Sequence, residues 1–470
     1  MIVEAHTQES QNPLHHREFR KLFAAQVIAL TGTGLSTVAL TLLAYDMVGG
    51  NAAAVLGSAL ACKMLAYVFF APVVGGLAHR FARKPFLITM DIIRAGLVLL
   101  MPFVTEVWQI YALVFTLNLF SAGFTPVFAA TIPDLLTDEP TYTRALSLSR
   151  LAYDLENLLS PVIAGIALLS ITYSGLFAAN SFAFACSATL IVITTFPLRE
   201  KFQRAGSVWQ EISFGTVAYL KTPRLRGLFA LYLGVAAASA MIIVNTIVYM
   251  KDSLGLTSTH VAFALAASGG GSMIAALSLP RLLNKLADRP VMLFGGGLMA
   301  LGVALISIGP DFIGVISIWF LIGIGWSLVQ TPAGRVVTRS SRPTDRTAFF
   351  SAQFALSHAG WLVFYPIAGQ LGARLGVETT ALILAGAISL FTLIASRLWP
   401  QQDIEVLVHE HQAIVHSHPH SHDQHHQHHH DTTVSDEAEH THEHRHESQR
   451  HAHPFVIDDH HTSWPTSSTP

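Results

Sequence analysis

Twelve long apolar runs are the feature of this sequence that most limits how the chain can fold. A helix needs roughly 20 apolar residues to cross about 30 Å of hydrocarbon. A chain with 51% hydrophobic and only 12% charged residues is also far from the composition of a water-soluble protein. We therefore predict an all-α membrane protein that crosses the lipid bilayer twelve times. The predicted spans are residues 22–46, 53–78, 86–105, 108–132, 147–171, 175–197, 227–250, 260–283, 290–309, 312–335, 348–372 and 377–398.

Lysine and arginine are concentrated in every second loop between these runs, which predicts that those loops face the cytoplasm. The loops of the opposite set contain little more than Lys251 and Arg374. With an even number of spans, both termini are then cytoplasmic. The basic residues of the first set are Arg80, Arg83, Lys84, Arg144, Arg150, Arg199, Lys201, Arg204, Lys221, Arg224, Arg226, Arg281, Lys285, Arg289, Arg335, Arg339, Arg342 and Arg346.

The longest polar interval before residue 399 divides the predicted spans into two sets of six. We expect a six-helix bundle at 1–198, a cytoplasmic linker at 199–226, a second six-helix bundle at 227–399 and a tail at 400–470. A short repeat supports a duplication, because Pro140, Thr141 and Ala145 recur 203 positions later. Their counterparts are Pro343, Thr344 and Ala348.

Motifs for chemistry or nucleotide binding are missing from the sequence. The two cysteines, Cys62 and Cys186, lie in apolar runs without CxxC spacing, so we predict neither a disulfide nor a thiolate metal site. No GxxxxGK[ST] loop occurs, which argues against ATP as the driving force. We predict no enzyme, no resident cofactor and no nucleic-acid partner, and no protein partner can be inferred.

The loop after the second predicted span resembles the signature loop of the major facilitator superfamily, which typically reads G-x-L-A-D-R-x-G-R-K. Here the sequence from Gly75 is G-G-L-A-H-R-F-A-R-K, with His79 in place of the usual aspartate and Ala82 in place of a glycine. Ser160 to Gly165 is similar to the G-P-x-x-G-G element of facilitator antiporters. The resemblance implies two six-helix bundles and a gating loop. The gating-loop residues are Gly75, His79, Arg80, Arg83 and Lys84.

Charged residues inside the apolar runs are candidates for function, because a charge in hydrocarbon costs about 2.5–3.5 kcal/mol on insertion scales. Asp91 and Arg94 lie three residues apart, so we interpret them as a structural ion pair on one helix face. Asp154 can pair in the same way with Arg150. Glu156 points to a different face of that helix, which leaves it as the freer carboxylate.

Glu156, Asn157 and Ser160 provide oxygen donors within about one helical turn, and His358 lies in the predicted counterpart helix of the second half. An imidazole opposite a carboxylate would form a metal site that loses protons as it binds metal. The alternative is that His358 only bonds a neighbouring helix. For Lys63, which would repel a divalent cation, we expect a role as counter-charge or as a proton-linked switch. Lys63, Asp154, Glu156, Asn157, Ser160 and His358 form the predicted transport pathway.

The tail is rich in histidine, with nineteen of the 25 histidines of the chain between His409 and His461. Neutral imidazole is a suitable ligand for nickel, zinc, copper and cobalt. His416, His418, His420 and His422 alternate, so they would all face one side of an extended chain. In a helical turn, His416 would instead pair with His420. The surrounding residues offer no core, so we expect a tail that is disordered without metal. The predicted tail ligands are His409, His411, His416, His418, His420, His422, His425, His426, His428, His429, His430, His440, His442, His444, His446, His451 and His453.

A facilitator core followed by such a tail resembles the nickel-resistance exporters of the NreB type. This resemblance implies export of nickel, with cobalt or another divalent transition metal as alternatives, across a bacterial inner membrane in exchange for protons. The tail then gathers metal beside a cytoplasmic opening. A rival hypothesis makes the tail a metal buffer or sensor on an exporter of a drug or siderophore, and a third is metal uptake. The sequence does not rank the metals.

Overall fold

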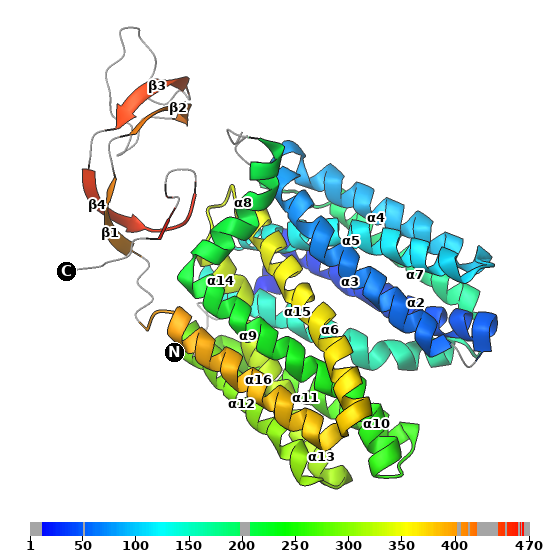
Figure 1. Ribbon diagram of the computed structural model, residues 1–470. Coiled ribbons are helices and arrows are strands. Elements are labelled where there is room, and N and C mark those ends of the chain that lie inside the picture. The colour runs from blue at the N-terminus through cyan, green and yellow to red at the C-terminus, as the bar shows by residue number, and fades with distance from the viewer. Residues whose placement is uncertain are drawn as a thin grey trace, which may run out of the picture.

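A computed structural model of the chain describes residues 12–49, 52–197 and 207–401. In the tail it describes residues 406–411, 414–420, 440–446, 449–458, 461, 463 and 464. The bundle is built of long helices that run roughly side by side, and the tail strands lie beyond one end of it (Figure 1). Among the described residues, twelve helices have 18 or more residues. The all-α class predicted for the bundle is therefore confirmed.

Six of these helices come from the first half of the chain. The start of α6 is fixed locally, because the Asp138 side chain accepts a hydrogen bond from the backbone N–H of Thr141 at 3.0 Å and Pro140 occupies the first turn. The helices are α2 (Arg17–Val48), α3 (Ala52–Leu77), α4 (Arg83–Leu100), α5 (Val107–Leu135), α6 (Glu139–Ala167) and α7 (Tyr173–Val192). Short 3-10 turns precede α2 (η1, Pro13–His15) and follow α3 (η3, Ala78–Arg80) and α4 (η4, Met101–Phe103).

The second half contributes the other six long helices. They are α9 (Pro223–Ala240), α11 (Ser258–Leu283), α12 (Asp288–Leu305), α13 (Phe312–Gln330), α15 (Arg346–Leu375) and α16 (Val377–Leu398). α9 continues through two π-helical turns, η5 (Met241–Asn245) and η6 (Tyr249–Ser253), on either side of α10 (Thr246–Val248). A 3-10 turn, η7 (Ile306–Ile308), follows α12, and α14 (Ala333–Arg339) precedes α15.

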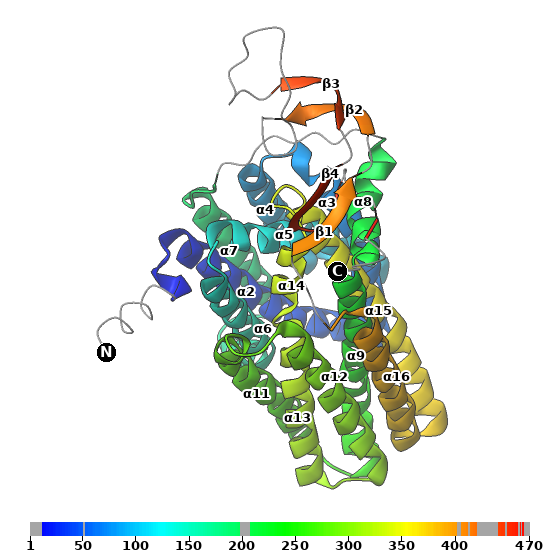
Figure 2. The ribbon, with the colours of Figure 1, turned by 90° about the vertical axis from the view of Figure 1, so that its left-hand side faces the viewer.

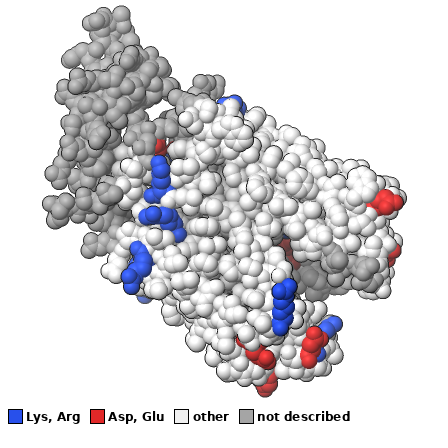
Figure 3. All heavy atoms as spheres, viewed as in Figure 1, with Lys and Arg blue, Asp and Glu red and all other residues white. Residues whose placement is uncertain are grey.

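Ten of the twelve long helices are apolar enough to cross a membrane on their own composition. The other two, α6 and α15, are the more polar ones: α6 carries Arg150, Asp154 and Glu156, and α15 carries Gln353 and His358. A polar helix in a membrane bundle is tolerated where its polar face meets protein instead of lipid. The helices in the view of Figure 3 are mostly uncharged on their outer surface.

The two halves meet along two pairs of helices, α3 with α15 and α6 with α11. Within each half the closest packing is α2 with α7 and α11 with α13. α11 and α13 approach each other through glycine: a Cβ added to Gly271 would lie 2.0 Å from the carbonyl oxygen of Phe320, and one added to Gly323 would lie 1.9 Å from that of Ser268. Small residues let membrane helices approach this closely.

The segment predicted as the linker, 199–226, contains a helix. α8 (Val208–Lys221) begins at a capping box formed by Ser207 and Gln210, and α9 already begins at Pro223. α8 packs against α3 and α15 at the end of the bundle nearest the tail strands (Figures 1 and 2). We call this end of the bundle the linker end. The domain boundaries at 198, 226 and 399 stay predictions.

The described part of the tail contains no helix and four strands in two antiparallel pairs. β1 (Val406–His411) pairs with β4 (Gln449–Pro454), and β2 (Ile414–His420) pairs with β3 (His440–His446). The β1–β4 pair lies nearer to the bundle than the β2–β3 pair (Figure 2). Of the two geometries left open for the alternating histidines, the structure has the extended one from His416 to His420.

We expect Gly323→Val to destabilise the bundle, because the new side chain meets the backbone of α11. Overpacking of this kind costs about 1–3 kcal/mol. Gly297→Val is the matched control, since a Cβ at Gly297 has no heavy atom within 4 Å and both variants place the same β-branched residue in a helix. Thermal unfolding of the detergent-solubilised protein should show a lower midpoint for Gly323→Val only. Equal midpoints would contradict the close α11–α13 approach.

Candidate functional site

Three of the predicted pathway residues, one each from α3, α6 and α15, are connected electrostatically through Lys63. The ammonium of Lys63 on α3 interacts electrostatically with the carboxylate of Glu156 on α6 and with the imidazole of His358 on α15. All three side chains are half-buried. Since α6 belongs to the first half of the chain and α15 to the second, the site is shared between the two bundles.

His358 is held in a defined orientation by its own helix and by aromatic rings. Its Nδ1 lies 2.7 Å from the backbone carbonyl oxygen of Phe354, and because a carbonyl can only accept, Nδ1 carries the proton. The neutral ring therefore keeps a lone pair on Nε2. Tyr67, Phe354 and Trp361 surround the imidazole with ring-centroid distances of 4.7, 4.2 and 4.7 Å. A fixed tautomer with one free nitrogen is the form in which histidine binds a metal ion.

Glu156 and Ser160 lie on the same face of α6, opposite Gly34 on α2. A Cβ added to Gly34 would lie 2.1 Å from the Ser160 hydroxyl and 3.4 Å from Cγ of Glu156. Asn157 points elsewhere: it is exposed, and its amide donates to the carbonyl oxygen of Tyr153 on its own helix at 2.9 Å. The structure thus brings Ser160 to Glu156 but does not bring Asn157 to the same place, since one residue turns a helix by about 100°.

Asp154 is occupied by other partners. Its carboxylate pairs with Arg150 at 2.7 Å, as predicted, and accepts a hydrogen bond at 2.6 Å from Ser272 on α11. Arg150 also donates to Gln330 on α13 at 3.1 Å and lies over the ring of Trp326. These contacts join α6 of the first half to α11 and α13 of the second. Asp154 therefore connects the two bundles, and it is a poor substrate ligand because its charge is already neutralised.

The described residues contain no group of three or more His, Cys, Asp or Glu side chains arranged to hold a metal ion. Two of the predicted pathway residues, Glu156 and His358, are of ligand type, and the cation of Lys63 acts electrostatically on each of them. A site with two protein ligands would leave positions open for water, which suits a cation that must be released again. A rigid storage site would need a closed ligand set.

The residues predicted as the gating loop pack against α8 and α15 at the linker end. A Cβ added to Gly75 would lie 2.4 Å from Cβ of Ser351, and one added to Gly76 would lie 2.4 Å from the backbone of Ile212. Arg80 makes hydrogen bonds of 2.9 Å to both carboxylate oxygens of Glu211 on α8. His79 stands in place of the usual aspartate, and its Nε2 lies 3.6 Å from the same carboxylate. An aspartate there would repel Glu211, whereas a histidine does not.

Asp134 at the end of α5 bridges two arginines from different halves of the chain. It forms ion pairs with Arg83, at the start of α4, and with Arg346, at the start of α15. Arg83 also donates to the hydroxyl of Thr347 at 3.3 Å. Lys84, the last predicted residue of the gating loop, is half-buried. These ion pairs hold the first and second bundles together at the linker end.

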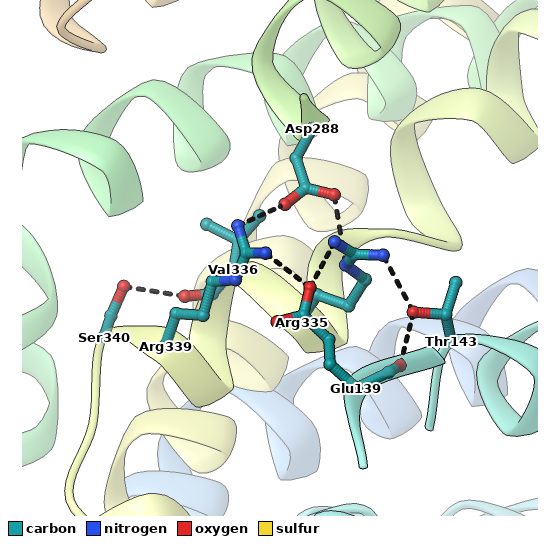
Figure 4. A network of polar contacts seen from close by, with 7 residues as sticks. All are labelled: Glu139, Thr143, Asp288, Arg335, Val336, Arg339 and Ser340. Carbon is teal, nitrogen blue, oxygen red and sulfur yellow. Dashed lines mark hydrogen bonds and ion pairs between the residues drawn. The ribbon is translucent and has the colours of Figure 1, made fainter. Parts of the chain in front are cut away.

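A second network closes the same end between α6, α12 and α14 (Figure 4). The carboxylate of Glu139 pairs with both Arg335 and Arg339, and Asp288 pairs with Arg339 at 3.1 Å and with Arg335 at 3.3 Å. Arg335 also donates to the Thr143 hydroxyl at 2.8 Å. In the sequence, these arginines indicate only the orientation of the loops. The sequence signal for their partners was the position of Glu139 and Asp288, which stand at helix starts next to loops rich in arginine.

Asp91 and Arg94 form the predicted ion pair. Asp91 is fully buried, and the guanidinium of Arg94 lies over the rings of Phe124 and Phe184 at 4.1 and 4.5 Å. This pair packs α4 against α5 and α7, away from the central site. Its surroundings fit the predicted structural role.

The strand register places many of the tail histidines opposite one another. On β2 and β3 the paired positions are His416 with His444, His418 with His442 and His420 with His440. Because alternate residues share a face, these six positions lie on one face of the pair. On β1 and β4, His409 is opposite His451. His411, His446 and His453 also lie in strands. His422, His425, His426, His428, His429 and His430 lie outside the described residues.

We expect Asp134→Asn to loosen the linker end, because the substitution removes the charge that two partly buried arginines share, and losing one partner of a fully buried ion pair costs about 3–5 kcal/mol as an upper bound. The reporter is a single cysteine at Ala355, which is buried where α3, α5 and α15 meet, in a background with Cys62→Ser and Cys186→Ser. Its labelling by a water-soluble thiol reagent should accelerate at least roughly tenfold.

The matched control for this variant is Asp138→Asn. Asp138 is exposed and caps α6, and asparagine caps a helix about as well as aspartate. Labelling should stay at the unsubstituted rate in this control. Equal labelling in the Asp134 and Asp138 variants would show that the Asp134 bridge does not hold the end closed.

Comparison with known proteins places this geometry in a family. Residues 22–242 and 228–413 match the model of the Major Facilitator Superfamily. The uncharacterized MFS-type transporter YfiS of Bacillus subtilis (strain 168) is 26% identical over 400 residues, which cover 80% of this chain and 93% of that protein. Macrolide efflux protein A of Streptococcus pyogenes is 24% identical over 298 residues, covering 61% and 72%.

Solved structures with the same fold share little sequence with this chain. The human organic anion transporter MFSD10 (TETRAN) has a TM-score of 0.69 at 12% identity and covers 81% of this chain and 99% of its own. A bacterial homologue of the iron transporter ferroportin, in an outward-facing state, gives the same values. The family match spans all twelve long helices, and these structures share their arrangement. The chain therefore belongs to the major facilitator superfamily and is a multi-pass membrane transporter.

Proposed function

We propose that this transporter exports a divalent transition metal, nickel or cobalt in the first place, from the cytoplasm in exchange for protons, and so confers metal resistance. The observation that carries the proposal is that a carboxylate, Glu156, and an imidazole with one lone pair available, His358, come from opposite halves of the chain and both interact electrostatically with Lys63. The nitrogen and oxygen donors of this site are those that nickel and cobalt accept.

Proton exchange follows from the chemistry of the ligands. A carboxylate and an imidazole bind metal only in their deprotonated forms, so an arriving metal ion releases protons and returning protons release the metal. The positive charge of Lys63 acts favourably on the carboxylate of Glu156. A divalent ion at Glu156 and His358 repels this ammonium, so Lys63 must swing away or lose its proton as metal binds. Movement of Lys63 and loss of its proton would both change the charge around Glu156 and His358 when metal binds.

The closed linker end supports an alternating-access cycle. The bridges at Asp134 and Glu139 hold the two halves together on the side where the arginines gather, and breaking them would open the central site to that side. We assign this side to the cytoplasm, because cytoplasmic loops of membrane proteins are rich in Lys and Arg. Both termini are then cytoplasmic, and the protein resides in a bacterial inner membrane.

The tail supports the choice of a metal substrate. The backbone register places His416 directly opposite His444 and His418 opposite His442, and directly opposite positions are neighbours in an antiparallel pair. A metal-binding segment tethered beside a cytoplasmic opening raises the local metal concentration there. One solved relative of the same fold, the bacterial ferroportin homologue, is named for an iron transporter.

A second candidate function is export of an organic compound such as a drug or siderophore, with the tail as a metal buffer or sensor. The aromatic rings around His358 favour it, since Tyr67 and Phe354 form a surface on which a flat or cationic molecule can stack. Indole Nε1 of Trp361 has no hydrogen-bond partner among the described residues and is available to a ligand. Macrolide efflux protein A has an organic compound in its name.

Metal accumulation in cells that express Glu156→Gln tests the central site. The substitution removes an anionic ligand and keeps the shape, so we expect export of nickel and cobalt to fall roughly tenfold or more, the loss typical of a disturbed metal site. Glu378→Gln makes the same chemical change on an exposed carboxylate at the start of α16 and should export normally. Retained metal export by Glu156→Gln would remove the proposed site.

Deletion of residues 401–470 separates the two candidate functions. A metal exporter fed by its tail should still lower cellular nickel after the deletion, although less effectively at low external metal. An exporter of organic compounds should leave cellular nickel unchanged with or without the tail, while resistance to the organic compound depends on the core. Measurement of both quantities in the same strains distinguishes the two outcomes.

A further inference from the structure

The end of the histidine tail contains an apolar segment that the polar composition around it does not explain. Phe455, Val456 and Ile457 follow β4 directly, and Trp464 comes shortly after. Phe455 and Ile457 are each only 3% exposed, and both belong to the same hydrophobic cluster as the helices of the second half. A segment that buries its apolar side chains against the bundle is not a freely solvated end.

The contacts of this segment are made with two basic residues at the linker end. Asp458 forms an ion pair with Arg342, in the segment between α14 and α15. The guanidinium of Arg224, in the first turn of α9, lies 5.7 Å from the ring centroid of Trp464. One acidic and one aromatic residue of the tail thus meet two arginines that are far apart in the sequence but close in the fold.

The segment is also organised internally. The backbone N–H of His461 donates to the carboxylate of Asp458 at 2.7 Å, and the His461 ring lies 3.0 Å from the same oxygen. Phe455 packs edge-on against both His461 and Trp464, with ring centroids 4.7 and 5.0 Å apart. This turn presents the Asp458 carboxylate to Arg342 in a fixed direction, which lowers the entropic cost of docking.

The electrostatics of Asp458 agree with a docked state. Burial alone would raise the pKa of this carboxyl group, but the hydrogen bond from His461 and the charge of Arg342 outweigh burial and hold the pKa well below its usual range. A carboxylate with a lowered pKa stabilises the docked form above its undocked pKa, and this contribution is lost only as the pH falls through the docked pKa. The ion pair therefore persists at neutral pH.

We propose that the described residues of 455–464 form an intramolecular anchor that binds the linker end of the second half at Arg224 and Arg342. The near end of the tail is fixed as well, because Trp399 is buried and its carbonyl oxygen accepts a hydrogen bond from Arg289 at 3.0 Å. The β1–β4 pair joins the two ends of the tail above these fixed points. The histidine tract is then a loop that is closed at both ends.

The position of the anchor connects this loop with the gate. Arg342 lies three residues after Arg339 and four before Arg346, both of which take part in the ion pairs that close the linker end. A loop fixed at both ends explores a smaller volume than a free tail, so its ligands stay concentrated beside that gate. This consequence for metal delivery rests on the proposed function, whereas the docking itself does not.

Cysteine crosslinking of the purified full-length protein tests the docking without metal or transport. In a background with Cys62→Ser and Cys186→Ser, the pair Arg342→Cys with Asp458→Cys should be joined by a short bis-maleimide within one chain. The control pair is Asp458→Cys with Asp311→Cys, because Asp311 caps α13 at the opposite end of the bundle. Crosslinking of the first pair that does not exceed the control would overturn the anchor.

Exchanging the charges of Asp458 and Arg342 tests their contact. Restored crosslinking in the double variant is a result that an unfolded tail would not give. The reporter is a crosslink by a short bis-maleimide between Lys221→Cys and Ser463→Cys, which are exposed positions next to the Arg224–Trp464 contact and leave both of those residues in place. Arg342→Asp alone should reduce its yield roughly fivefold, the factor expected for loss of one favourable ion pair, and Asp458→Arg alone should do the same. The double variant should restore the yield. Failure of restoration, with the single variants reduced, would show that Asp458 and Arg342 do not recognise each other.

Metal export by the anchor variant Trp464→Ala then separates the two proposals. If the metal-feeding role is right, this variant exports less nickel than the intact chain at low external metal. Its export should still equal or exceed that of the chain that ends at residue 400. If crosslinking confirms the anchor but export is unchanged, docking stands and its role in delivery is wrong.

Discussion

The cost of placing charge in hydrocarbon decides how this bundle is assembled. Ten of the long helices meet that cost by being apolar, but α6 and α15 cannot, because each carries charged or strongly polar side chains along its length. They are tolerated because their polar groups face other helices. Arg150 and Asp154 of α6 bond to α11 and α13, and His358 of α15 lies among the aromatic rings of α3 and its own helix. Because their polar groups must avoid lipid, α6 and α15 lie at the interface of the two halves, and their polar side chains are therefore found there.

The pairs that lie within one helix could be predicted from the sequence, and those that cross between helices could not. Asp91 with Arg94, and Arg150 with Asp154, follow from helical spacing alone. The partners of the gating loop depend on how α8 and α15 pack, so Glu211 and Asp134 were not predicted as its partners. The twelve spans were predicted because each is a long apolar run, but α8 inside the linker was overlooked because an amphipathic helix on a surface has no such run.

The candidate site shows the same division. The sequence places Glu156 and His358 on counterpart helices. In the structure each of them interacts electrostatically with Lys63. It also separates Asn157 from this group, since rotation by one residue turns that side chain to another face. In the tail, composition identified the histidines but obscured Phe455, Ile457 and Trp464. Those apolar residues in a polar segment were the available signal for docking.

Transport by the purified protein in liposomes tests the central claim most directly. A proton gradient imposed across the membrane, with nickel on one side only, should drive nickel across against its own gradient. A pH-sensitive dye should report opposite movement of protons, and the movement of both should cease in Glu156→Gln. Proton-driven movement of an organic cation with no nickel flux, in protein that binds nickel normally through its tail, would contradict the account.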